Sequence, residues 1–189
     1  MLKKADIKKL LLTALSPQEL RDLWHSTLPN ETGINVIDYD DIINCKNING
    51  LFRNDNKLII FYPNHQGEFL FGHYCALILG KKEGTIYFFD SYGGRPDVDQ
   101  KRYSGTQRKD LYKEEENSLI NLLLESGYDV DYSHHKLQSL TNNSATCGRW
   151  CLTRCALKNL TNDEFAQVIK SLSKLKNISP DEVVVQTFH

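Results

Sequence analysis

The chain has 189 residues, of which 40% are hydrophobic and 25% are charged. This length and composition suit one domain with its own hydrophobic core. A formal net charge of −1 excludes a general attraction to nucleic acid, although Lys3, Lys4, Lys8 and Lys9 cluster near the N-terminus and keep local polyanion binding open. No apolar run approaches the roughly 20 residues that span a bilayer, and the start lacks a signal-peptide pattern. We therefore expect a soluble intracellular protein without a membrane partner.

The cysteines predict free thiols. There are five, an odd number, at Cys45, Cys75, Cys147, Cys151 and Cys155, and the last three follow one another at helical spacing. One helix face cannot supply the ligands of a tetrahedral zinc site, so we expect no zinc. We also expect no other metal and no cofactor. Cys151 and Cys155 are expected as buried apolar residues on the inner face of a helix.

The N-terminal part reads as helical. Leucines recur through residues 2–27, and Ser16-Pro17-Gln18-Glu19 has the pattern of a capping box with proline at the first helical position. Residues 29–56 are polar and rich in loop formers, with only short apolar pieces. We expect a helical lobe over residues 1–28, followed by loops beside the functional cleft.

The middle of the chain predicts a sheet. Residues 58–64, 69–80 and 85–94 are rich in aliphatic and aromatic side chains and are separated by turn formers, which is typical of an antiparallel meander. Residues 93–109 form a polar loop. Later elements are expected in this order: an amphipathic helix over 111–126 stopped by Gly127, a strand over 128–138, a helix from Cys147 to about Lys158, and segments that begin with capping boxes at 161–164 and 179–182. The predicted fold class is α+β, a mixed sheet flanked by helices.

Four polar residues indicate a catalytic site. Cys147-Gly148 opens an expected helix, whose unpaired N–H groups and positive dipole end favour a thiolate. His73 lies within an apolar strand as a candidate base, and Asp90 follows the next strand, where its carboxylate can fix the tautomer of His73. Gln138 lies shortly before Cys147, and its amide can face an oxyanion.

Each of these residues has an alternative role. Cysteine and histidine in such positions are more often core residues, and an aspartate before a turn commonly caps that turn. His134 and His135 are rival bases, and Asn142 and Asn143 can replace Gln138 as the oxyanion donor.

Three neighbours of the predicted site carry structural expectations. Gly148 is read as allowing close approach of a substrate carbonyl, which packing alone would not require. Trp24 and Trp150 are expected as core anchors, and Tyr74 and Trp150 are also expected to line a narrow cleft beside Cys147.

At these residues the chain resembles a known family of cysteine proteases, which contains the adenovirus maturation protease and the Ulp/SENP SUMO-processing enzymes, with counterparts in virophages and Polinton-like elements. The resemblance rests on GHYCALI around His73, YFFDSYG around Asp90, Gln138, and TCGRWC around Cys147, within residues 58–160. It implies a cysteine-protease fold with the nucleophile at a helix N-terminus. The domain would span residues 1–189, with the catalytic core over about 58–160 and C-terminal helices over 161–189.

The resemblance also implies a function. We expect a cysteine endopeptidase that cleaves near glycines and processes viral capsid proteins during maturation, in the virion or the host cytoplasm. Its partner would be a protein substrate, with nucleic acid as a weaker possibility. A SUMO or ubiquitin-like-modifier protease and an acetyltransferase on the same catalytic framework are the alternative activities, and a non-catalytic binding module is a third reading.

Overall fold

The computed structural model describes residues 2–42, 44–53, 55–66, 69–96, 118–140 and 144–189. Within these residues, five strands form one sheet in the order β1-β2-β3-β4-β5. The strands are β1 (Asn35–Asp38), β2 (Lys57–Gln66), β3 (Phe69–Leu79), β4 (Thr85–Phe89) and β5 (Asp129–Tyr132). The β2–β3 and β3–β4 pairs are antiparallel, whereas β1 and β5 pair parallel to their neighbours at the two edges. The predicted meander and the predicted α+β class with a mixed sheet are thus confirmed.

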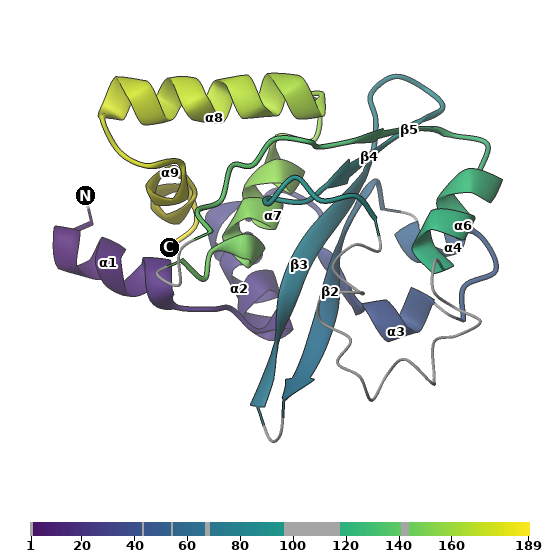
Figure 1. Ribbon diagram of the computed structural model, residues 1–189, viewed down its shortest axis with the longest axis horizontal. Helices are drawn as coiled ribbons and strands as arrows, with labels where there is room; N and C mark the ends of the chain where they lie inside the picture. The colour runs from purple at the N-terminus through teal and green to yellow at the C-terminus, as the bar shows by residue number, and fades with distance from the viewer. Residues whose placement is uncertain (1, 43, 54, 67–68, 97–117, 141–143) are drawn as a thin grey trace.

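Helices cover both faces of this sheet (Figure 1). They are α1 (Lys4–Leu12), α2 (Pro17–Thr27), α3 (Tyr39–Ile42), α4 (Ile48–Phe52), α6 (Ser118–Glu125), α7 (Cys147–Ala156), α8 (Asn162–Lys176) and α9 (Pro180–Thr187). One hydrophobic cluster joins α2, α7, α8 and α9 to the face that carries Tyr74, Ala76 and Ile78. A second joins α3, α4 and α6 to the face that carries Cys75 and Leu77. Alternation along β3 therefore places successive side chains in different cores.

Helix starts follow the predicted capping signals. Ser16, Thr161 and Ser179 each accept a hydrogen bond from the backbone N–H three residues later, and a glutamate at that position closes each capping box. Such a cap satisfies N–H groups that otherwise have no partner, and each is worth about 1 kcal/mol. The three boxes fix where α2, α8 and α9 begin.

α7 lies at the centre of the first core. Every residue from Gly148 to Cys155 is buried, including Arg149 and Arg154. The guanidinium of Arg154 donates to Asn162 Oδ1, Leu157 O and Leu160 O, so its polar groups are paired inside the protein. Cys151 and Cys155 are buried free thiols, as predicted. The helix is therefore held on all sides.

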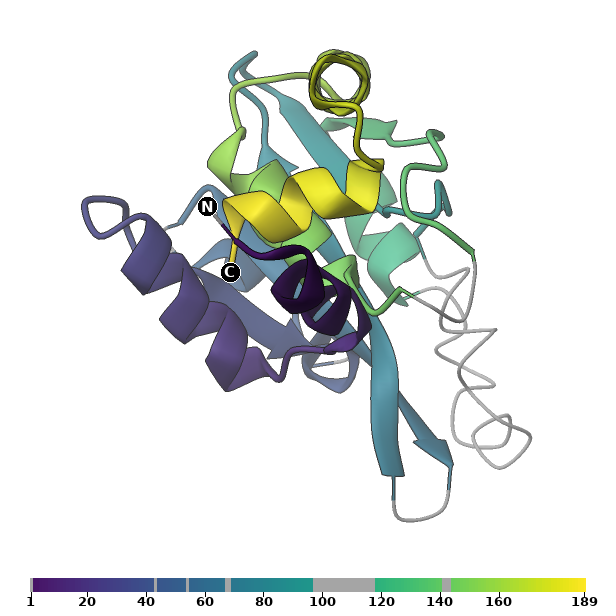
Figure 2. The same cartoon turned by 90° about the vertical axis from the view of Figure 1, so that its left-hand side faces the viewer.

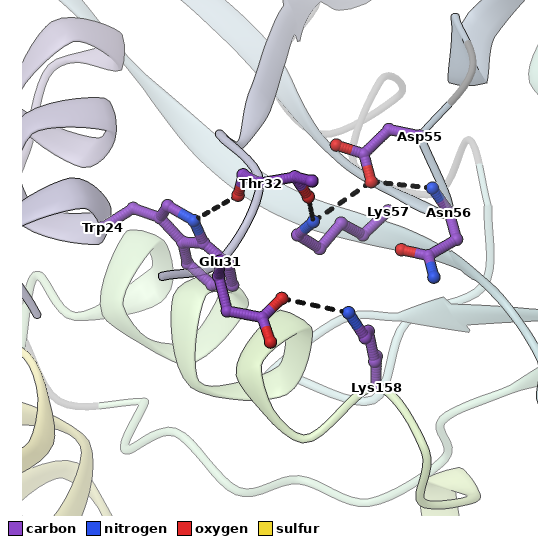
Figure 3. A network of polar contacts seen from close by, with 7 residues as sticks. All are labelled: Trp24, Glu31, Thr32, Asp55, Asn56, Lys57 and Lys158. Atoms are coloured by element: carbon purple, nitrogen blue, oxygen red, sulfur yellow. Dashed lines mark hydrogen bonds and ion pairs between the residues drawn. The ribbon is translucent and has the colours of Figure 1, made fainter. Parts of the chain in front are cut away.

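A buried lysine anchors the start of β2 (Figure 3). Lys57 is fully buried, and its Nζ donates to Thr32 Oγ1 at 2.8 Å and to Asp55 Oδ1 at 3.0 Å. Trp24 Nε1 donates to Thr32 O at 2.8 Å, so α2 joins the same network. Removing one member of a buried ion pair leaves an uncompensated charge, which is costly. This network fixes the sheet end opposite to the one where His73 lies.

Several expectations need correction. Residues 29–56 were expected as loops, but they contain β1, α3 and α4. The strand predicted over 128–138 ends at Tyr132. Of the helix predicted over 111–126, the described part is α6, and Gly127 follows it with a positive φ of 73°, as a C-cap requires. Residues 97–109 of the predicted polar loop lie outside the described residues. None of the described helices combines the length and apolar character of a bilayer crossing.

Candidate active site

The unequal lengths of β3 and β4 create the site. The ladder between them runs from Leu79↔Ile86 to Ala76↔Phe89. The β3 residues before Ala76, including His73, therefore extend past the end of β4, as does the rest of the β2–β3 hairpin (Figure 2). Asp90 is the first residue after β4. The chain thus leaves the sheet at Asp90, in contact with His73 of the neighbouring strand.

His73 and Asp90 form a buried pair. Nε2 of His73 lies 2.7 Å from Oδ1 of Asp90, and each residue is 1% exposed. Because Nε2 contacts the carboxylate, Nδ1 is the ring nitrogen that can contact the second partner of the ring, the thiol of Cys147. The two residues that the sequence predicts as partners thus lie in contact, and the orienting role of Asp90 stays a prediction.

The carboxylate of Asp90 is held by its own turn. Its Oδ1 accepts from Tyr92 N at 2.9 Å and its Oδ2 accepts from Gly94 N at 2.6 Å. Burial alone would raise the pKa of Asp90, but hydrogen bonds and charge attraction from His73, with those two backbone donors, lower it. The carboxylate of Asp90 thus contacts both its own turn and the ring of His73.

Two glycines make that turn possible. Gly93 has φ of 72°, and a Cβ there would lie 2.8 Å from the backbone oxygen of His134. A Cβ at Gly94 would lie 2.2 Å from Oδ2 of Asp90. Neither position has room for a side chain, because Gly93 packs on the backbone of His134 and His135 and Gly94 packs on the carboxylate itself.

Cys147 approaches His73 from the other core. It is the first residue of α7, is partly buried and is a free thiol. Burial alone would lower the pKa of His73, but hydrogen bonds to Asp90 and Cys147, together with their negative charges, raise it to about 10. A histidine flanked by a carboxylate and a thiol therefore favours the imidazolium form.

Gly148 has a structural role that differs from the prediction. A Cβ at this position would lie 2.8 Å from Leu20 Cδ2 and 3.4 Å from Tyr74 Cδ2. Gly148 therefore lets the first turn of α7 pack directly on α2 and β3. The sequence reasoning held that packing would not require glycine after Cys147, whereas this close packing does require it.

The predicted aromatic cleft is also wrong in its residues. Tyr74 is buried, packs against the tilted ring of Phe61, and donates a hydrogen bond from its hydroxyl to Leu15 O. Trp150 is fully buried, as expected of a core anchor, so neither ring lines an open cleft. The aromatic ring that covers the site is Tyr92, which is partly exposed and stacks on His73 with a centroid separation of 4.9 Å.

Gln138 is oriented by a residue that the sequence reasoning missed. Ser91 Oγ donates to Gln138 Oε1 at 2.7 Å, and Gln138 N donates to Ser91 O at 3.0 Å. Because the amide oxygen accepts from Ser91, the amide N–H groups are the part of Gln138 that can face another acceptor. Ser91 directly follows Asp90, so one turn supports both residues. A serine in a turn carries no sequence signal for this role.

The rival bases lie together elsewhere. His135 Nε2 is 2.7 Å from Asp163 Oδ1 on α8, and the rings of His134 and His135 are 4.3 Å apart. The alternative oxyanion donors, Asn142 and Asn143, lie outside the described residues. Of the two histidine groups, only the one at His73 has both a buried carboxylate and a thiol partner.

Among the described residues, two groups of side chains have the residue types to hold a metal. His73, Cys75 and Asp90 place their ligand atoms within 4.8 Å of one another, and so do His134, His135 and Asp163. In the first group, Nε2 of His73 and Oδ1 of Asp90 are already paired at 2.7 Å. That contact length is a hydrogen bond, and a metal would have to separate the two atoms.

Comparisons with known proteins give one sequence relative. No family model matches the chain. An uncharacterised protein, V9, of the Sputnik virophage is 34% identical over 114 residues, which is 60% of this chain and 64% of that protein. The chain therefore spans less than two thirds of this relative, whose name states no activity.

Two solved structures resemble the chain weakly. One is the C-terminal Ulp1 protease domain in complex with Smt3, the yeast ortholog of SUMO, with 14% identity and a TM-score of 0.40 over 97% of this chain and 78% of that one. The other is ChlaDub1 from Chlamydia trachomatis, with 12% identity and a TM-score of 0.29 over 98% and 93% of the two chains. At these TM-scores neither likeness establishes a common fold.

Proposed function

We propose that this chain is one catalytic domain and acts as a cysteine endopeptidase, with Cys147 as nucleophile, His73 as base and Asp90 as the group that orients the base. One observation carries the proposal. His73 is buried between a carboxylate at 2.7 Å and the thiol of a residue at a helix N-terminus. This is the arrangement that nucleophilic catalysis by cysteine needs.

The reaction follows from these positions. His73 takes the thiol proton of Cys147, and Sγ attacks the carbonyl carbon of the substrate peptide bond. The tetrahedral intermediate collapses as the imidazolium of His73 protonates the leaving amine, which leaves a thioester on Sγ. Water, deprotonated by His73, then hydrolyses the thioester and restores the thiol. Throughout, Asp90 stabilises the imidazolium without taking its proton.

Gln138 completes the proposed machinery. The oxyanion of the intermediate needs donors that are already in place, and the proposed pair is the side-chain amide of Gln138 and the backbone N–H of Cys147. The contact between Ser91 Oγ and Gln138 Oε1 supports this role, because it turns the amide N–H groups away from Ser91. Loss of one oxyanion donor typically costs about 100-fold to 1,000-fold in kcat.

The proposal extends to the substrate. The motifs around His73, Asp90 and Cys147 resemble those of viral maturation and Ulp-type proteases, which supports cleavage beside glycine in a capsid protein. Tyr92 is the side chain that we propose restricts the substrate, since it covers His73 and is partly exposed. The virophage relative supports a viral setting, in the virion or the host cytoplasm. Contact with nucleic acid stays a secondary proposal that rests on the N-terminal lysines.

Mass spectrometry of cleaved proteins tests the proposal. Purified protein is incubated with a lysate of virus-infected host cells, and new N-termini are compared between wild type and Cys147→Ala. We expect new termini at sites that contain glycine, produced only by the wild type. Cys45→Ala is the matched control, because Cys45 is also a partly buried free thiol but lies in the other core, and this variant should cleave like the wild type.

Three outcomes contradict parts of the proposal. Cleavage by Cys147→Ala would remove the nucleophile. Release only of SUMO or ubiquitin-like modifiers would favour the modifier protease over capsid processing. Acetylated lysines without any new termini, in samples supplied with acetyl-CoA, would favour the transferase.

A further inference from the structure

Asp181 is a buried carboxylate on α9 that the proposed mechanism does not use. It is 5% exposed and accepts three hydrogen bonds. Oδ1 accepts from Thr146 Oγ1 at 2.5 Å and from Trp150 Nε1 at 2.8 Å, while Oδ2 accepts from Ser139 N at 3.0 Å. A buried carboxylate with three donors holds all three in fixed positions.

Two of these donors adjoin the proposed catalytic residues. Ser139 directly follows Gln138, and Thr146 directly precedes Cys147. The two oxygens of one carboxylate thus bind the chain on either side of the segment that joins the oxyanion donor to the nucleophile. Ser144 Oγ lies 2.8 Å from Thr146 Oγ1 and extends the network along that segment.

α9 is itself firmly fixed to α7. Its start is closed by the capping box of Ser179 and Glu182. Beyond its end, the oxygen of Phe188 accepts from Arg149 Nε at 3.1 Å, and Arg149 lies on α7. Figure 2 shows α9 beside α1 and across α7. Asp181 therefore projects from a helix that is held at both ends.

We propose that Asp181 is a positioning residue that sets the distance between the oxyanion donor Gln138 and the nucleophile Cys147. This inference rests on the proposed function. Asp181 acts through Ser139 and Thr146 and does not touch the reacting atoms. Misplacing a catalytic group by about 1 Å can lower the rate about 100-fold, so a fixed spacing matters even without contact to the substrate.

Two substitutions separate the two sides of this link. Asp181→Asn keeps one acceptor oxygen for Thr146 and Trp150 but turns an N–H group toward the N–H of Ser139. We expect kcat to fall by at least about tenfold with KM within about twofold, because only the oxyanion side is released. Thr146→Val removes the hydroxyl that links the nucleophile side to Asp181. Because Cys147 is then less firmly positioned, we expect iodoacetamide to alkylate it at least about threefold more slowly at pH 6.

Thr161→Ala is the matched control. It removes the capping box of α8 and lowers the melting temperature, but Thr161 belongs to another helix and binds neither Ser139 nor Thr146. We expect kcat and the alkylation rate to stay at wild-type values. Asp181→Asn should also leave alkylation of Cys147 unchanged, since the link to Thr146 is kept.

The outcomes distinguish this inference from the proposed function. If wild type cleaves peptides and Asp181→Asn lowers the melting temperature but leaves kcat unchanged, Asp181 is only a structural residue. If wild type cleaves nothing, the proposed function fails. Alkylation needs no substrate, so an unchanged rate in Thr146→Val then overturns the positioning role as well.

Discussion

Gly94→Ala should disable the site by moving one carboxylate. In the structure a Cβ at position 94 would lie 2.2 Å from Oδ2 of Asp90, and ordinary contacts begin at 3.4 Å. The separation must therefore grow by 1.2 Å. If Asp90 makes this shift, its 2.7 Å contact with His73 exceeds the length of a hydrogen bond.

The expected loss of activity follows from that displacement. A misplacement of about 1 Å costs about 100-fold in rate, and a 100-fold fall in kcat/KM corresponds to about 2.7 kcal/mol of transition-state stabilisation. Overpacking of a buried turn costs about 1–3 kcal/mol of folding free energy in addition. The variant should fold, with a lowered melting temperature, and should be nearly inactive.

Two measurements check this prediction. One is kcat/KM on a peptide identified from the cleaved proteins, with Gly33→Ala as the control, because a Cβ at Gly33 meets nothing within 4 Å. The other is the low-field proton NMR signal of the ring N–H that His73 shares with Asp90, which needs no substrate. Retention of both kcat/KM and that signal in Gly94→Ala would refute the reasoning, because the carboxylate would not have moved.

Other predictions concern the buried charges and the thiols. Asp55→Asn should destabilise the protein by about 3–5 kcal/mol in urea unfolding, because it leaves Lys57 with a weaker partner in the core, whereas combining it with Lys57→Met, which removes both charges, should be nearly neutral. The pKa of His73 is raised above its unfolded value of 6.5, so its stabilising contribution is present below pH 6.5 and is lost as pH rises toward about 10. Urea unfolding should show this fall in the wild type and a flatter profile in His73→Ala. At pH 6, iodoacetamide should label Cys147 before Cys151, because burial raises the pKa of the Cys151 thiol well above its usual value; equal labelling would contradict an activated thiol at position 147.

Local signals in the sequence predicted much of the fold. The capping boxes at Ser16, Thr161 and Ser179 act within one helical turn, so they could be read directly and the structure confirms them. The β2–β3–β4 meander follows from apolar runs separated by short turns. The edge strand β1 could not be read in the same way. β1 has four residues and pairs parallel to β2, so its stability comes from a partner distant in sequence.

The site divides along the same line. The order of His73, Asp90, Gln138 and Cys147 predicted the residues of the candidate site, and the structure brings His73, Asp90 and Cys147 together. Their catalytic roles stay predictions.

The supporting residues had no distinctive sequence signal. Asp181 reads as an ordinary acidic residue in the first turn of a helix, where the helix dipole alone would account for it. Gly148 was read as making room for substrate. A glycine in a sequence shows only that a side chain would not fit at that position. The neighbour that leaves no room here is Leu20 on α2, which is distant in sequence.

The links around Cys147 also determine when the site can form. Ala145 N donates to Leu11 O on the N-terminal side, and Thr146 donates to Asp181 near the other end of the chain. Contacts between residues so distant in sequence close late in folding, because loop-closure entropy must be overcome first. During translation, His73, Asp90 and Cys147 are synthesised before Asp181. We therefore expect a nascent chain to contain His73, Asp90 and Cys147 while Cys147 is not yet held in position. Activity should begin only after α9 has packed against α7.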